Sequence, residues 1–207
     1  MVYSYRNLNI NIMKKTIAIF ALVAAVMLVG CGKSYPSEIA VYKFDSAVIQ
    51  YEYSGSVEGD ATLYVRGDQK AMFKSLGDSN TLEIDLGDKG YEADLDKGTA
   101  VEVANAEYGK LKEMSMGEQE IYLVKKALGL KEGAEDPIAS LKKVIAGKTC
   151  NVYAISNIGS ACIWNGIVLE KEVTIQDVTN RQVAVSVQTD VEVGDSRFEL
   201  PASVILQ

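Results

Sequence analysis

Residues 47–65 read AVIQYEYSGSVEGDATLYV, two alternating segments separated by a turn that contains two glycines. The apolar residues from Ala47 to Tyr53 fall on one face of an extended chain, and the residues between them are mostly polar. This alternation is typical of a strand with one buried face. The same pattern resumes over 61–65, so the segment predicts two neighbouring antiparallel strands.

The alternation continues on both sides of a central interruption. Glycine-containing turns separate the alternating runs at intervals of roughly 8 to 12 residues, which is typical of antiparallel sheets. In the run 182–193 one face is nearly all valine, with Val183, Val185, Val187, Val191 and Val193 interrupted only by Thr189. Further strands are predicted at 82–86, 91–95, 101–103, 149–155, 161–169 and 173–178.

Between residues 107 and 147 the apolar spacing changes to that of amphipathic helices. Ile121, Val124 and Leu128 mark the first predicted helix. A second helix is predicted through Ile138, Leu141 and Ile145, with Asp136 as its N-cap, Pro137 at its first position and Gly147 at its C-terminal end.

The order of strands, then helices, then strands predicts an α+β fold. About ten strands is near the upper limit for a twisted open sheet, which tends to curl. We therefore expect a curved antiparallel sheet that forms an incomplete β-barrel, with the helices packed on its concave face. Such an arrangement can leave an apolar cavity.

Composition excludes several classes of function. The chain has 207 residues, 48% of them hydrophobic, a net charge of -7 and no histidine. The absence of histidine removes the usual general base and the commonest metal ligand, and no nucleophile has a base beside it in sequence. We therefore expect no enzyme, no metal site and no cofactor. No Lys/Arg-rich block suggests a nucleic-acid partner.

The N-terminal region has the features of a signal peptide. Residues 13–31 read MKKTIAIFALVAAVMLVGC, in which two lysines precede an apolar run and a cysteine. The apolar run is shorter than the about 20 residues needed to span a bilayer, which makes a permanent transmembrane helix the weaker interpretation. Residues 1–30 are therefore predicted to be removed. The extension before the lysines leaves Met13 as an alternative start.

The tetrad Leu28-Val29-Gly30-Cys31 resembles the lipobox of bacterial lipoproteins. This resemblance implies cleavage before Cys31 and attachment of diacylglycerol to its sulfur, so that acyl chains tether the protein to a membrane. Residues 31–38 then form a lipidated tether, and 39–207 form one domain. The mature chain has 18 basic and 28 acidic side chains, a net charge of -10, which argues against electrostatic adhesion to anionic lipid.

Cys150 and Cys162 are the other two cysteines of the chain. They lie on adjacent predicted strands outside the reducing cytoplasm, where a disulfide is the default expectation. Their midpoint is residue 156, so a hairpin turning around 156–159 would place them opposite each other. Two buried free thiols are the alternative.

The C-terminal half resembles periplasmic proteins with the Lol-type fold, a superfamily that includes the lipoprotein-localisation carrier and receptor. The segments concerned are GKTCNVYAI (147–155), ACIWNGIVLEKE (161–172) and SRFELPASVIL (196–206), and they are most similar to the uncharacterised branch. The resemblance implies a half-barrel closed by helices over an apolar cavity. Candidate ligand contacts, with ordinary sheet core as the alternative, are Tyr51, Leu63, Ile84, Trp164, Val185 and Val187.

These features lead to one main expectation about function. The protein is expected to be a lipoprotein of the cell envelope that faces the periplasm and binds a hydrophobic ligand, either a lipid or an acylated protein. The alternative is a protein-interaction or sensory module without a ligand. Gly32 stands where an aspartate retains some lipoproteins at the inner membrane, which favours the outer membrane.

Overall fold

The computed structural model describes residues 42–131 and 133–207, which belong to the second of two units into which the chain divides, Tyr35–Gln207. The predicted signal peptide, Cys31 and the predicted tether lie outside the described residues. Among the helices that are described, none is both long enough and apolar enough to cross a membrane.

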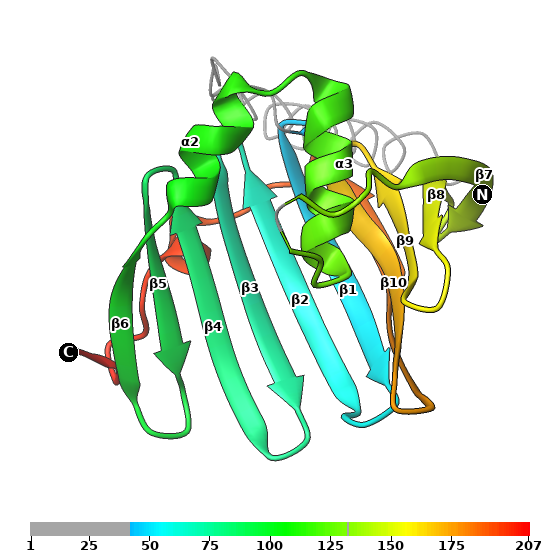
Figure 1. Ribbon diagram of the computed structural model, residues 1–207. Coiled ribbons are helices and arrows are strands. Elements are labelled where there is room, and N and C mark those ends of the chain that lie inside the picture. Colours follow the sequence, from blue (N-terminus) through cyan, green and yellow to red (C-terminus); the bar gives the residue numbers. More distant parts are fainter. Residues whose placement is uncertain (1–41, 132) are drawn as a thin grey trace, which may run out of the picture. The chain divides into compact units, whose positions relative to one another are not determined.

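The described strands form one open sheet of twelve strands (Figure 1) in the order β12-β6-β5-β4-β3-β2-β1-β11-β10-β9-β8-β7. Neighbouring strands are antiparallel except for the parallel pair β12 and β6. The predicted open antiparallel sheet is therefore confirmed. The strands are β1 (Ser46–Ser54), β2 (Gly59–Arg66), β3 (Gln69–Leu76), β4 (Ser79–Leu86), β5 (Lys89–Asp94), β6 (Thr99–Ala104), β7 (Ile138–Ile145), β8 (Lys148–Ile155), β9 (Gly159–Trp164), β10 (Ile167–Ile175), β11 (Val178–Thr189) and β12 (Ile205–Leu206).

Two meanders make up the sheet, and the first strand joins them. β1 to β6 follow one another as hairpins, and β7 to β11 do the same. β1 pairs with β2 on one side and with β11 on the other. Ile49, for example, lies between Leu63 of β2 and Val187 of β11. The β1–β11 pair is therefore the seam that holds the two meanders together.

Helices α2 (Ala106–Glu113) and α3 (Met116–Ala127) lie across the same face of the sheet in Figure 1. Ser115 caps α3: its hydroxyl accepts from the backbone N–H of Glu118, whose carboxylate accepts from the backbone N–H of Ser115. Val124 and Leu128 then pack against Tyr153, Ala161 and Ile163 of β8 and β9. We call the side of the sheet that carries these residues the helix face.

The opposite side, here called the tail face, is covered by the C-terminal segment. After β11 the chain crosses β3 and β4 through the 3-10 helix η1 (Asp195–Phe198). Val193 and Phe198 pack there against Leu82 and Ile84 in a second buried cluster. Arg66 secures the crossing, because one of its guanidinium N–H groups donates to the carbonyl of Val193 at 2.9 Å. The sheet is thus covered on both sides.

The predicted second helix is wrong: residues 138–145 form strand β7. β7 and β8 are joined by a two-residue turn in which Ala146 (φ 46°) and Gly147 (φ 77°) both have positive φ. Two-residue turns of this kind match the twist of a β-hairpin. Gly147 is therefore a turn residue rather than a helix end, and the β-branched Ile138, Val144 and Ile145 favour the strand.

The predicted all-valine face of residues 182–193 is also wrong. Gln50 pairs with Ser186 whereas Tyr51 pairs with Ala184, so Val185 is an extra residue in a β-bulge. The bulge reverses the alternation. Val187 lies on the side of Ile49, whereas Val183 pairs with Glu52 and points to the tail face. The sequence also does not predict β3, whose residues QKAMFKSL do not alternate clearly, or the two-residue β12.

Candidate functional site

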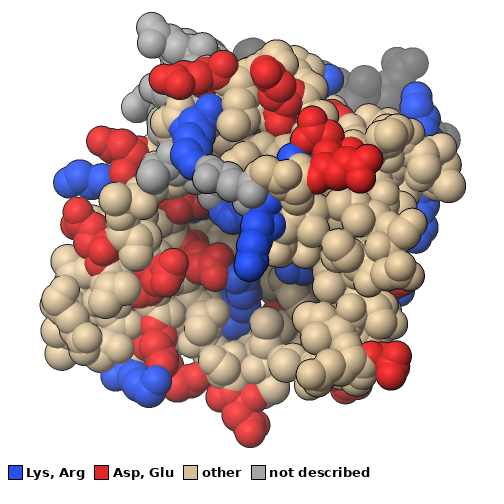
Figure 2. All heavy atoms as spheres, viewed as in Figure 1, with Lys and Arg blue, Asp and Glu red and all other residues tan. Residues whose placement is uncertain are grey.

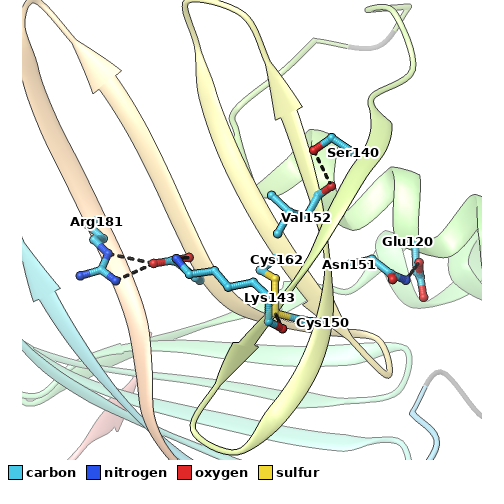
Figure 3. The surroundings of a disulfide bond; sticks show 9 residues. Glu120, Ser140, Lys143, Cys150, Asn151, Val152, Cys162 and Arg181 are labelled. Carbon is cyan, nitrogen blue, oxygen red and sulfur yellow. Dashed lines mark hydrogen bonds and ion pairs between the residues drawn. A yellow bond between two sulfur atoms is a disulfide. The ribbon is translucent and has the colours of Figure 1, made fainter.

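Cys150 and Cys162 form the predicted disulfide, with their Cα atoms 5.5 Å apart (Figure 3). The expected register is not observed, because Cys162 pairs with Val152. The loop between β8 and β9 has three residues, 156–158, and its central Asn157 has a φ of 62°. This loop moves the centre of the hairpin by one residue, so the two cysteines are diagonal neighbours on the same face of the sheet.

A buried carboxylate lies beside the disulfide on the tail face. Lys143 donates to Glu170 at 2.6 Å, and Arg181 donates to the other oxygen of the same carboxylate at 2.6 and 2.9 Å. Figure 3 shows Lys143 passing the disulfide in the direction of Arg181. Burial opposes the charge of Glu170, but the hydrogen bonds from Lys143 and Arg181 outweigh it and hold the pKa of Glu170 below its ordinary value. The carboxylate is fully engaged in ion pairs, which is typical of a structural role.

The candidate site is a hollow on the helix face, at the C-terminal end of α3. Its volume is about 350 Å³, within the range of small-molecule pockets. Most of its surface is apolar. Figure 2 shows this side of the molecule as hollowed below the helices, with basic side chains at the centre and acidic ones beside them. The hollow is lined by Tyr53, Ser54, Val57, Ala127, Leu128, Gly129, Lys171, Val173, Ile175, Asn180, Arg181 and Gln182.

Three of the lining side chains form a row across adjacent strands. Tyr53 of β1 pairs with Gln182 of β11, and Gln182 pairs with Lys171 of β10. Directly paired residues share a face of the sheet, so all three point to the helix face. The row is bordered by Gly59, opposite Tyr53, and by Ala161, opposite Lys171.

Burial changes the protonation behaviour of this row. It is the main cause of the lowered pKa of Lys171; the neighbouring ammonium of Lys74 lowers that pKa further, while the carboxylate of Glu83 raises it. Burial, with a smaller contribution from Glu83, raises the pKa of Tyr53 to about 12. Tyr53 is therefore a hydrogen-bond donor at neutral pH. Lys74 and Glu83 form an ion pair with each other on neighbouring strands.

A second hollow of about 310 Å³ lies between β4, β5 and β6. Its polar lining is mainly acidic, with Glu83, Glu92 and Asp94. The described residues contain no group of three or more cysteine, aspartate or glutamate side chains placed to hold a metal ion.

The six predicted ligand contacts lie in different parts of the fold. Tyr51 and Leu63 are buried in the core between the two meanders, and the Tyr51 hydroxyl donates to the carbonyl of Val168 at 3.0 Å. Ile84 lies in the other buried cluster, on the tail face. The ring of Trp164 stacks on Phe44, with ring centroids 5.4 Å apart.

The two valines differ from each other. Val185 is the exposed residue of the β11 bulge, whereas Val187 is half-buried opposite Ile49. None of the six predicted residues lines either of the two hollows described above. Their role as ligand contacts stays a prediction. The row of Tyr53, Gln182 and Lys171 was not identified from sequence, because it depends on the pairing of three strands that are distant along the chain.

No protein-family model matches the chain, and no curated protein matches it. Solved structures of MucB are similar at 10% sequence identity, each over 79% of this chain. A structure of MucB in complex with MucA(peri) has a TM-score of 0.47, the Pseudomonas aeruginosa MucA/MucB complex 0.48, and MucB itself 0.46. The matches span 57%, 58% and 60% of those chains, so this chain covers less than two thirds of their length.

Proposed function

We propose that this chain is a non-catalytic lipoprotein of the cell envelope that binds an apolar ligand, a lipid or an acylated protein, in the hollow at the end of α3. The observation that carries the proposal is the apolar wall of this hollow. Val57 and Ile175, which are 48% and 59% exposed, both line it. Large apolar side chains at the mouth of a hollow gain free energy when a ligand covers them.

The remaining parts of the proposal come from the sequence. Cys31 carries the lipid anchor, the protein faces the periplasm, and the outer membrane is its membrane of residence. The chain belongs to the Lol-type superfamily, and the helix face is the concave side of the half-barrel. The function is non-catalytic because the chain has no histidine and no nucleophile paired with a base.

The test measures binding of a fluorescent fatty-acid analogue to the full chain in phosphatidylcholine nanodiscs, with empty nanodiscs as the blank. We expect saturable binding that Ile175→Asp weakens about tenfold or more, because a charge in the apolar wall opposes ligand entry. Val144→Asp is the matched control, since Val144 is similarly exposed but lies on β7. Equal effects of the two substitutions, or non-saturable binding alone, would contradict the proposal.

A second candidate function, binding of a partner protein, is favoured by strand β7. β7 is the last strand in the order of the described sheet, so the backbone groups along one of its sides have no described strand to pair with. Ile138, Leu141 and Val144 along it are 78%, 58% and 66% exposed. An exposed edge with apolar side chains is suited to strand addition by an extended segment of another chain. Lys142, Lys143 and the bulge at Ser140 oppose indiscriminate pairing.

Photo-crosslinking in cells separates the two candidates. A photoreactive residue at position 175 is expected to capture a lipid or an acylated chain, whereas one at position 144 captures a partner protein if the edge is the functional surface. A protein adduct at position 144 together with no adduct at position 175 would favour the second candidate over the first.

A further inference from the structure

The row formed by Tyr53, Gln182 and Lys171 brings three hydrogen-bond donors into the hollow. Among the described residues, none of these three side chains has a hydrogen bond or an ion pair within 4 Å. Gln182 is only 6% exposed, and Tyr53 and Lys171 are half-buried. Their polar atoms still reach the hollow, because among the described residues no buried side-chain nitrogen or oxygen lacks a hydrogen-bond partner. The three donors can therefore bind an acceptor that enters the hollow from outside the chain.

The charge of the row indicates what that acceptor is. Lys171 contributes an ammonium group, Gln182 an amide N–H and Tyr53 a hydroxyl that stays protonated at neutral pH. The burial and the neighbouring Lys74 that lower the pKa of Lys171 both act against its positive charge. A bound anion would offset both effects. Glu83, whose negative charge acts on Lys171, is already paired with Lys74.

The other lining residues indicate the chemistry of the part of the ligand that does not contact the three donors. Val57, Leu128, Val173 and Ile175 surround the same hollow, and no acidic side chain of the described residues lines it. A small inorganic anion would reach the donors but leave Val57, Val173 and Ile175 uncovered. An amphiphile with one anionic group satisfies the donors and covers the apolar wall at the same time.

We propose that Lys171, Gln182 and Tyr53 bind the anionic headgroup of an amphiphile, a carboxylate or a phosphate, while its apolar chain lies against Val57, Val173 and Ile175. This inference rests on the proposed function, because it requires that the hollow binds an apolar ligand. It adds the class of ligand and the residues that select it. The headgroup chemistry is shared by free fatty acids and by phospholipids, which the test separates.

The test uses the full chain in phosphatidylcholine nanodiscs with three probes of equal chain length: dodecanoate, dodecyl phosphate and dodecanol. Lys171→Met keeps the length of the side chain and removes its charge. We expect this variant to bind dodecanoate or dodecyl phosphate at least about tenfold more weakly and to bind dodecanol as the wild type does. Lys171→Arg keeps the positive charge and should still bind the two anionic probes. The matched control is Lys142→Met, at an exposed lysine of β7.

The outcomes distinguish the two proposals. Tighter wild-type binding of dodecanoate than of dodecyl phosphate points to a fatty acid, and the reverse order points to a phospholipid. If dodecanol binds as tightly as both anions, or if Lys171→Met weakens all three probes equally in a folded protein, the headgroup inference is wrong while the hollow still binds ligand. If none of the probes binds saturably, the proposed function itself fails.

Discussion

At the scale of single residues, Glu170 is the buried acid on which the region around the disulfide depends. Glu170→Gln removes the charge that Lys143 and Arg181 neutralise, and we expect it to lower the free energy of unfolding by about 1.5–3 kcal/mol at neutral pH. Thermal unfolding can be followed through Trp164, the single tryptophan of the chain. Glu172→Gln, an exposed acid two residues away on β10, is the control and should have little effect.

The same residue predicts a pH dependence with a definite sign. The pKa of Glu170 is lower in the folded protein than in the unfolded chain, so its contribution to stability is complete above the unfolded pKa, which is about 4.3. The contribution is lost as the pH falls through the folded pKa. The stability difference between wild type and Glu170→Gln should therefore shrink below about pH 4.3. A difference that stays constant between pH 7 and pH 3 would contradict this assignment.

At the scale of elements, the β7–β8 hairpin contains a turn that is not optimal for its conformation. Ala146 has a φ of 46°, which costs an alanine about 1 kcal/mol, whereas asparagine tolerates this region better. The chain already has Asn165-Gly166 in the equivalent turn between β9 and β10, with φ values of 48° and 81°. We expect Ala146→Asn to stabilise the protein by about 1 kcal/mol in thermal unfolding, and Asn165→Ala to destabilise it by a similar amount.

The elements also show what sequence patterns can and cannot predict. Strands with clear alternation, such as β1, and the helix marked by Val124 and Leu128 were predicted correctly because burial alone determines their pattern. β7 was mistaken for a helix, since an apolar residue at every third or fourth position also fits an irregular edge strand with few buried side chains. The bulge at Val185 has no signal in sequence, because it arises from pairing with β1.

The candidate site could be predicted even less than the fold. Tyr53, Gln182 and Lys171 are ordinary polar residues of half-buried strands until the register of three strands aligns them. The disulfide is predicted from the sequence, because two cysteines on adjacent predicted strands of a chain with a predicted signal peptide have few alternatives. A site whose residues are brought together by strand pairing therefore cannot be recognised from one sequence alone.

At the scale of the whole molecule, the C-terminal segment acts as the cover of the tail face. Phe198 is buried against the cluster of Leu82 and Ile84, and the guanidinium of Arg66 lies 4.7 Å from the centroid of its ring. Phe198→Ala should lower the free energy of unfolding by about 3 kcal/mol or more, as measured in denaturant. The neighbouring exposed Glu199→Ala should not. Similar losses for both variants would mean that the segment does not seal the sheet.

The seam between β1 and β11 has a consequence for the timing of assembly. A chain that is threaded through a membrane from its N-terminus delivers β1 first and β11 after every other long strand. Until β11 arrives, β1 has one unpaired side and the first meander has an open edge at what later becomes the middle of the sheet. Contacts so distant along the chain form slowly, and open edges attract other strands. For the proposed exported protein, the interval between translocation of β1 and its pairing with β11 is therefore the period in which it most needs protection from aggregation.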